Sequence, residues 1–287
     1  MRHHSFFKSL AAALSLAAAL AVATLGMAPV AAQEASPWSE DHASRARLIA
    51  GDAHGDGRLI GLEILMDEGY KTYWRHPGDS GLPPEIDWTG SQNVADVEIL
   101  FPAPGRYKDA SGVFFGYSGE VILPLLVTPV DPALPIALSL SLEYGVCKEI
   151  CIPARAELAL SAPDAPAKAH VDAIAAAVEQ VPVRQDPGAG EFAITSVKAG
   201  APGHLMVGVR APEDALLFAE GPDYRWFLAP EEAMQPGGEP DTGEFVVELA
   251  ERPADVEEPV RLVFTLAADG HAIETVVELS PDELPQP

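Results

Sequence analysis

The sequence predicts a mainly β protein with two β-sandwich domains joined by one α-helix. Short apolar runs bounded by Gly, Pro, Asp and Asn recur along residues 44–161 and again along residues 192–279, as in sandwich domains. The chain contains 27 prolines and 24 glycines, which suits a fold with many turns. Between the two β-rich segments the hydrophobic period changes from that of a strand to that of a helix.

The first β-rich segment contains seven predicted strands. They are Ala46–Ala50, Leu59–Met66, Thr72–Trp74, Val94–Phe101, Val121–Thr128, Ile136–Tyr144 and Arg155–Leu160. The second segment contains seven more, with no cysteine and no evident catalytic cluster. They are Phe192–Val197, His204–Val209, Ala215–Phe218, Trp226–Ala229, Glu244–Leu249, Val260–Leu266 and His271–Leu279. We therefore expect the second domain to have a structural or partner-binding role.

The connecting helix is predicted over residues 163–183. Val171, Ile174, Val178 and Val181 recur at helical spacing, and alanine fills much of the remainder. A Pro- and Gly-containing linker follows over residues 185–190. The predicted domains are thus residues 38–162 and 190–282, on either side of the helix.

The amino terminus has the features of a secretory signal peptide over residues 1–32. Arg2 and Lys8 precede an apolar run from Leu10 to Leu25, and small residues stand before a cleavage position at Gln33. The run is short for a membrane span, and no later stretch is long enough, so we expect an exported protein without stable membrane insertion. An oxidising compartment allows a cysteine pair to form a disulfide.

The charge of the chain argues against nucleic-acid partners. The formal net charge is −25 and becomes −27 once the two basic residues of the signal peptide are removed. Binding phosphate backbones or anionic membrane surfaces needs a basic surface, so both classes of partner are disfavoured. The sequence also lacks the G-x-S-x-G and H-E-x-x-H motifs of common hydrolases.

The only two cysteines, Cys147 and Cys151, lie in the stretch Y-G-V-C-K-E-I-C-I-P. Residues alternate between apolar and polar on both sides of the pair, which predicts a β-hairpin. The loop of Lys148, Glu149 and Ile150 would place the two sulfurs opposite each other, within reach of a disulfide. We expect no cofactor other than this redox-active disulfide.

Three interpretations of the pair remain open from the residues alone. A purely structural disulfide would stabilise the fold by only roughly 2 kcal/mol, because the loop that it closes is short. Two thiolates could instead bind copper, although the mature histidines are scattered without paired spacing. Thiol–disulfide exchange through mixed disulfides is the third. On a hairpin no helix dipole lowers the thiol pKa, so we expect a relay rather than a broad oxidant.

An aromatic stretch at residues 112–119, G-V-F-F-G-Y-S-G, could protect the sulfurs from unwanted oxidation. The glycines at both ends permit movement, as a flap would need. The alternative is that these aromatic residues are part of the core.

The cysteine stretch, residues 73–84 (Y-W-R-H-P-G-D-S-G-L-P-P) and the F-F-G-Y stretch together resemble the amino-terminal periplasmic domain of the thiol:disulfide interchange reductase DsbD. The likeness is greatest to its relatives linked to suppression of copper sensitivity, the ScsB type. It covers roughly Ser44 to Gln180 with good motifs. The resemblance implies an immunoglobulin-like fold in the periplasm and a component of a protein-disulfide reductase.

The resemblance also assigns roles to residues and to partners. Cys147 and Cys151 match the redox pair, which takes electrons from a membrane-embedded thiol–disulfide reductase and passes them to periplasmic thioredoxin-like proteins. Phe114, with Phe115 and Gly116, matches the cap loop over the pair. Aromatic residues that line the site match Tyr73 and, less closely, Tyr70.

Two departures from the family matter. The founding members space their cysteines more widely. The membrane domain and the carboxy-terminal thioredoxin domain have no counterpart here, so we expect a standalone domain whose electron donor is a separate polypeptide. Copper tolerance through the same cysteines, or an interaction module with a static disulfide, remain the alternatives.

Overall fold

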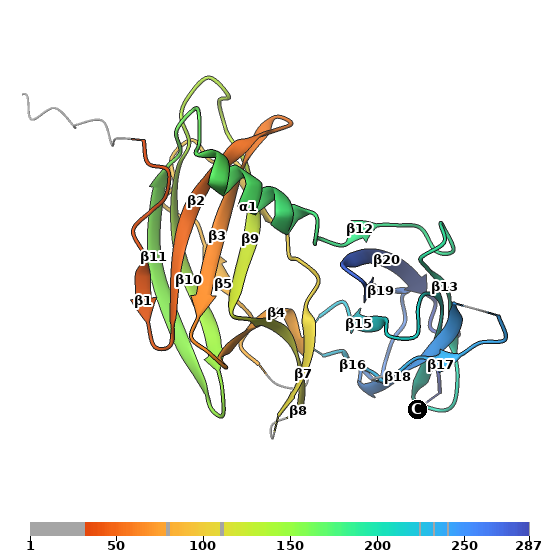
Figure 1. The fold of residues 1–287 in the computed structure, drawn as a ribbon. Helices are drawn as coiled ribbons and strands as arrows, with labels where there is room; N and C mark the ends of the chain where they lie inside the picture. Colours follow the sequence, from red (N-terminus) through yellow and green to blue (C-terminus); the bar gives the residue numbers. More distant parts are fainter. Residues whose placement is uncertain are drawn as a thin grey trace, which may run out of the picture. The chain divides into compact units, whose positions relative to one another are not determined.

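The computed structural model of the chain describes residues 32–286, except residues 79, 80, 110, 111, 224, 232 and 240 (Figure 1). The predicted signal peptide, residues 1–32, lies outside the described residues apart from Ala32. By their contacts the described residues belong to one unit. Strands dominate this unit and form four sheets, which confirms the predicted mainly β fold class.

The first sandwich is built from eleven strands in two sheets. One sheet has the order β1-β2-β3-β9-β6, and the other has the order β11-β10-β4-β8-β7 with β5 paired to β10. The strands are β1 (Ser39–Asp41), β2 (Ser44–His54), β3 (Gly57–Met66), β4 (Lys71–Gly78), β5 (Glu85–Asp87), β6 (Asp96–Ile99), β7 (Gly105–Asp109), β8 (Gly112–Ser118), β9 (Glu120–Thr128), β10 (Ala137–Cys147) and β11 (Cys151–Ser161).

Alternating burial explains why the long hairpin of β10 and β11 forms. On β10 the side chains of Leu138, Leu140 and Leu142 are buried, and the residues between them are more exposed. On β11 the buried positions include Leu158 and Leu160. Period-two burial is what a strand with one face on the core requires. The hairpin therefore closes one side of the first core.

The helix α1 (Lys168–Val178) lies on the outer face of the other sheet, where Figure 1 shows it crossing β2, β3 and β9. Its buried residue Ile174 packs where Gly51 and Gly61 leave room on β2 and β3. Because the helix covers this face, β3 is buried on both sides from Ile60 to Ile64. The helix is shorter than the predicted span of residues 163–183.

The second sandwich has a four-stranded sheet, β12-β20-β19-β15, and a five-stranded sheet, β13-β14-β18-β16 with β17 paired to β18. Its strands are β12 (Val183–Arg184), β13 (Ala193–Ala199), β14 (His204–Arg210), β15 (Leu216–Glu220), β16 (Phe227–Pro230), β17 (Gln235–Pro236), β18 (Thr242–Glu251), β19 (Val260–Ala268) and β20 (His271–Leu279). Its own core includes Phe245 and Phe264. Phe218 of β15 is an exception, because it packs in the core of the first sandwich.

Each predicted strand overlaps an observed one, and the structure adds β1, β5, β7, β8, β12 and β17. The main difference concerns residues 112–118, for which the sequence allows either a flap over the sulfurs or a place in the core. They form β8, a strand that pairs with both β4 and β7. Its aromatic residues are therefore held in a sheet.

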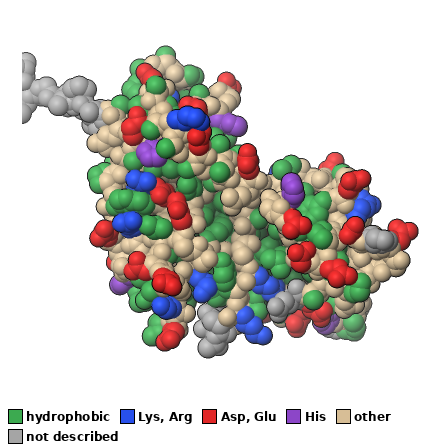
Figure 2. Space-filling view, in the orientation of Figure 1, with side chains coloured by type: hydrophobic (Ala, Val, Ile, Leu, Met, Phe, Trp, Pro, Cys, Tyr) green, Lys and Arg blue, Asp and Glu red, His purple; other side chains and the backbone are tan. Residues whose placement is uncertain are grey.

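The surface carries the acidic character of the composition. Figure 2 shows Asp and Glu side chains spread over the visible face of both sandwiches rather than gathered in one patch. Over the part of the chain that is described, no helix has the length and hydropathy to cross a lipid bilayer.

Candidate functional site: the Cys147–Cys151 disulfide

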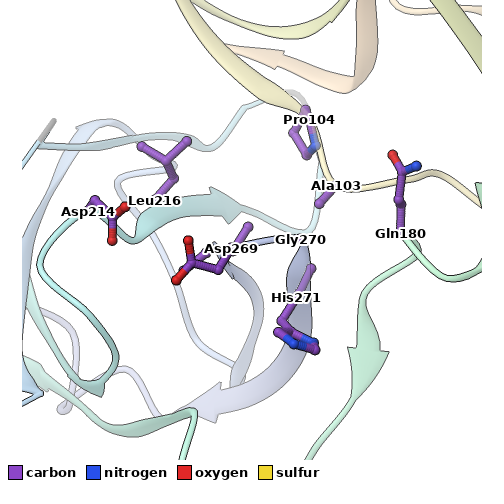
Figure 3. A pocket seen from close by; sticks show the side chains of 11 residues that line it. Ala103, Pro104, Gln180, Asp214, Leu216, Asp269, Gly270 and His271 are labelled. Carbon is purple, nitrogen blue, oxygen red and sulfur yellow. The ribbon is translucent and has the colours of Figure 1, made fainter.

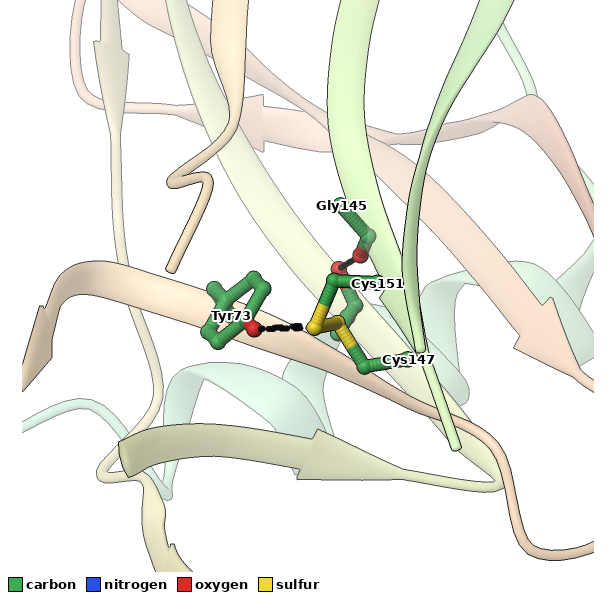
Figure 4. Close-up of a disulfide and its surroundings, with 5 residues drawn as sticks. Tyr73, Gly145, Cys147 and Cys151 are labelled. Atoms are coloured by element: carbon green, nitrogen blue, oxygen red, sulfur yellow. Dashed lines mark hydrogen bonds between the residues drawn. A yellow bond between two sulfur atoms is a disulfide. The ribbon is translucent and has the colours of Figure 1, made fainter. Parts of the chain in front are cut away.

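The β10–β11 hairpin brings the two cysteines together. The strands pair without a register shift from Ala137 opposite Ser161 to Cys147 opposite Cys151. The three loop residues turn the chain, and the backbone N–H of Lys148 donates to the carbonyl of Ile150 at 3.4 Å. Cys147 and Cys151 form a disulfide, with their Cα atoms 4.1 Å apart (Figure 4). The predicted hairpin and the opposed sulfurs are thus present.

The two cysteines differ in accessibility. Cys147 is 2% exposed, whereas Cys151, the first residue of the outgoing strand, is exposed. A disulfide is cleaved by an incoming thiolate that must reach one of its sulfurs. A protein partner can therefore reach the disulfide from the side of Cys151, with Cys147 as the buried leaving group.

Tyr73 of β4 lies against both sulfurs. Its hydroxyl oxygen is 2.8 Å from Sγ of Cys151 and 2.9 Å from Sγ of Cys147, and Figure 4 shows the phenol pointing at the disulfide. Neither sulfur of a disulfide carries a hydrogen, so the hydroxyl is the donor. Once the pair is reduced, the same hydroxyl can donate to a thiolate, and a hydrogen bond to a charged group favours the charged form.

Three aromatic rings form what we call the aromatic cover: Tyr73, Phe114 and Tyr107. Tyr73 and Phe114 are buried together with Cys147 in one cluster, and Tyr107 packs against it. The Phe114 ring lies edge-on to Tyr73, with centroids 5.5 Å apart, and is stacked with Tyr107 at 5.3 Å. Phe114 is thus held between two tyrosines beside the buried cysteine.

Tyr107 was not among the predicted site residues. It lies on β7, directly opposite Phe114 of β8. The sequence contained one indication, because Tyr107 lies shortly before the aromatic stretch of residues 112–119. Without a prediction that this stretch is a strand, however, no register could place Tyr107 against Phe114.

Close backbone packing explains two glycines at the site. A Cβ on Gly116 would lie 2.0 Å from the carbonyl oxygen of Thr72, so β8 can approach β4 only with glycine there. A Cβ on Gly145 would lie 2.7 Å from the Tyr73 ring. Glycine at residue 145 therefore leaves the space in which Tyr73 reaches the sulfurs, and the hydroxyl of Thr72 donates to its carbonyl at 2.9 Å.

The other predicted residues lie elsewhere. Phe115 is on the opposite face of β8 from Phe114 and is 3% exposed in the main core of the first sandwich. Tyr70 packs at the edge of that core, with the Nζ of Lys148 5.2 Å from its ring centroid. The residues of the motif at positions 79 and 80 lie outside the described residues.

Two lysines stand near the disulfide. Lys71 is paired with Cys147 where β4 meets β10, and its Nζ lies 5.4 Å from the Tyr107 ring centroid. Lys148 reaches back from the hairpin loop, and its Nζ donates to the carbonyl of Glu68 at 3.3 Å. The Nζ of Lys71 is thus placed at a ring of the aromatic cover, and that of Lys148 at Tyr70 and the carbonyl of Glu68.

The hollow drawn in Figure 3 is separate from the disulfide site. A hollow of about 270 Å³ is lined by residues 103–104, Gln180, Asp214, Leu216 and residues 267–272, and Figure 3 shows Asp269 and His271 at it. None of the predicted site residues lines it. Among the described residues, no group of three or more His, Cys, Asp or Glu side chains is placed to hold a metal ion.

The chain is similar to known proteins both in sequence and in structure. Residues 40–163 match the family described as "Thiol:disulfide interchange protein DsbD, N-terminal". The chain is similar in structure to the N-terminal periplasmic domain of ScsB from Proteus mirabilis, with a TM-score of 0.69 and 23% identity, over 87% of this chain and 99% of that one. This likeness shows a shared fold across both sandwiches.

A conserved domain protein from Bacillus anthracis aligns over 88% of this chain and 91% of its own, at 7% identity. Its TM-score of 0.22 is too low to support any argument. Functionally curated proteins give no match. The family match covers both cysteines and all three rings of the aromatic cover. Residues 40–163 therefore belong to the family of DsbD N-terminal domains.

Proposed function

We propose that this chain is a periplasmic thiol–disulfide exchange protein that relays reducing equivalents through Cys147 and Cys151. The donor would be a membrane-embedded thiol–disulfide reductase, and the acceptors would be thioredoxin-like proteins of the periplasm. The observation that carries the proposal is a disulfide whose Cys151 is exposed to solvent and whose Cys147 is buried. The Tyr73 hydroxyl lies within hydrogen-bond distance of both sulfurs. Membership of residues 40–163 in the DsbD N-terminal family supports it.

The reducing half of the cycle begins with a donor thiolate that attacks Sγ of Cys151. The Cys147–Cys151 bond breaks, and Cys147 leaves as a thiolate that the Tyr73 hydroxyl can stabilise. The second donor thiol then attacks the mixed disulfide and releases Cys151. Two electrons and two protons have passed to the pair, and the donor is left as a disulfide.

The oxidising half runs in the opposite direction. The Cys151 thiolate attacks the acceptor's disulfide, one acceptor sulfur leaves, and a mixed disulfide forms. Cys147, held beside Cys151 by the hairpin register, then attacks Sγ of Cys151 and releases the second acceptor sulfur. The acceptor gains two electrons as a dithiol, and the disulfide of the chain is restored.

Exposed apolar side chains near Cys151 suit a protein partner. Ile150 is 74% exposed, Ile152 is 37% exposed and Leu82 is 43% exposed. Leu82 lies beside the hairpin, since its carbonyl accepts from the N–H of Gly145 at 3.2 Å. Apolar groups left at the surface mark interaction sites when they gather around a functional group. The copper alternative has no comparable support.

The first prediction tests the relay itself. In a Cys147→Ala variant, Cys151 can still attack an acceptor's disulfide, but no resolving thiol remains, so mixed disulfides should accumulate in the periplasm. Cys151→Ala leaves only a thiol that is 2% exposed, and it should trap far less. Non-reducing gels with mass spectrometry would identify the adducts. A variant with both cysteines replaced by alanine is the control. The proposal fails if the single variants trap no more protein than this control, or if none of the trapped proteins is thioredoxin-like.

The second prediction concerns the Tyr73 hydroxyl. Tyr73→Phe keeps the ring and removes a donor to the thiolate, and a hydrogen bond to a charged group contributes about 1.5–3 kcal/mol. Since about 1.4 kcal/mol is a factor of ten, iodoacetamide should alkylate the reduced pair at least about tenfold more slowly at neutral pH. Tyr107→Phe is the matched control, because that hydroxyl donates to Ser118 Oγ. Equal rates in wild type and Tyr73→Phe would remove the hydroxyl from the mechanism.

The third prediction concerns protection by Phe114. Phe114→Ala opens the aromatic cover, so diamide should oxidise the reduced pair several-fold faster in stopped-flow measurements. Phe101→Ala is the control, since Phe101 is a buried ring of the same sandwich outside the cover. Both substitutions should destabilise the fold by about 3–5 kcal/mol. If oxidation is unchanged in Phe114→Ala, or equally fast in both variants, Phe114 does not shield the sulfurs.

A further inference from the structure

Strands β4 and β8 each carry a residue of the aromatic cover next to a residue that contacts the second sandwich. On β4, Tyr73 contacts the sulfurs and the next residue, Trp74, packs in the main core. On β8, Phe114 belongs to the cover and the next residue, Phe115, packs in the main core. Successive side chains of a strand point to opposite faces, so each pair is rigidly connected through one backbone.

The second sandwich supplies the ring against which both core residues pack. Phe218 of β15 is fully buried, and its ring centroid lies 4.9 Å from that of Phe115 and 5.7 Å from that of Trp74. The contact with Phe115 is edge-to-face, with an interplanar angle of 89°. Phe218 thus completes the first core directly behind the two strands that carry the cover.

Ion pairs also connect β4 to the second sandwich. Between Tyr73 and Gly78 the pairing of β4 with β8 is interrupted by a register shift. Within this bulge, the guanidinium of Arg75 donates to the Glu220 carboxylate from Nε, at 3.0 and 3.2 Å, and from Nη2, at 2.7 Å, and Nη2 also donates to Glu274 at 2.5 Å. Both glutamates belong to the second sandwich and are 15% and 12% exposed. Paired charges with this little solvent contact are difficult to separate.

The bulge also contains a half-buried histidine, His76. Burial lowers the pKa of its imidazole from the ordinary value of 6.5, against an opposing effect of the Glu220 charge. Trp74 and Arg75, the two residues that follow Tyr73, are thus the ones that contact the second sandwich, and His76 beside them is partly withdrawn from solvent.

We infer that Phe218 and Glu220 are positioning residues for the disulfide, which act through Trp74, Phe115 and Arg75 on Tyr73 and Phe114. The second sandwich thereby sets how well the aromatic cover shields Cys147 and how well the Tyr73 hydroxyl meets the sulfurs. Close-packed interiors transmit displacement, so a gap behind β4 and β8 moves the cover in front of them. The inference rests on the proposed thiol chemistry but requires no particular partner.

The test compares Phe218→Leu and Glu220→Gln with a matched control, Phe245→Leu, all in the full mature chain. Phe245 is fully buried in the core of the second sandwich and lies outside the cluster that includes Trp74 and Phe115. Two rates are measured on the reduced protein: oxidation by diamide, and alkylation by iodoacetamide across a range of pH. Circular dichroism and urea unfolding establish that each variant is folded under the assay conditions.

We expect Phe218→Leu and Glu220→Gln to raise the diamide rate by about 2- to 30-fold, the usual range for coupling between packed sites. The pH profile of alkylation should move to higher pH as the Tyr73 contact weakens. Phe245→Leu should change the unfolding midpoint but neither rate. Wild-type rates in both test variants, or the same rate change in Phe245→Leu, would overturn the inference. Because both reagents are small molecules, these results stand whether or not partners are trapped by the cysteine variants.

Discussion

The hydrogen-bonded register of β10 with β11 is the constraint on which the site depends. Eleven residue pairs run unbroken from Ala137–Ser161 to Cys147–Cys151, and a shift of one residue would move the cysteines out of opposition. Buried leucines on one face of both strands fix that register, because a slip would expose them. The packing that fixes the register of the hairpin therefore also brings the two sulfurs together.

Protection and accessibility are divided between the two cysteines by the same geometry. Cys147 ends a strand that is flanked by β4, so it lies under the aromatic cover, whereas Cys151 begins the outer strand β11 and is exposed. The proposed relay would use this division, with one sulfur open to partner thiols and the other withheld from small oxidants. The contacts of Phe218 and Arg75 extend the account to the second sandwich, for which the sequence predicted a structural or partner-binding role.

The hairpin and its disulfide could be predicted because alternation along Leu138–Tyr144 and Arg155–Leu160 is a local signal. Strand β8 escaped prediction because Phe114 and Phe115 are buried on opposite faces, so the strand shows no alternation. The register of Tyr107 against Phe114 was lost with it. Contacts of Phe218 and Glu220 with β4 join residues more than a hundred positions apart, and no short-range pattern reports them.

The central claim is that the Cys147–Cys151 disulfide is reversibly reduced and re-oxidised. The reduction potential of the pair tests it most directly, because a purely structural disulfide would stay oxidised. The potential can be measured by equilibrating the mature protein with glutathione redox buffers, and with dithiothreitol buffers for lower potentials, and counting free thiols by mass spectrometry after alkylation. The account predicts reversible two-electron behaviour with a potential of about −120 to −270 mV, within the range of thioredoxin-like partners. A potential below about −300 mV, typical of structural disulfides, would contradict it.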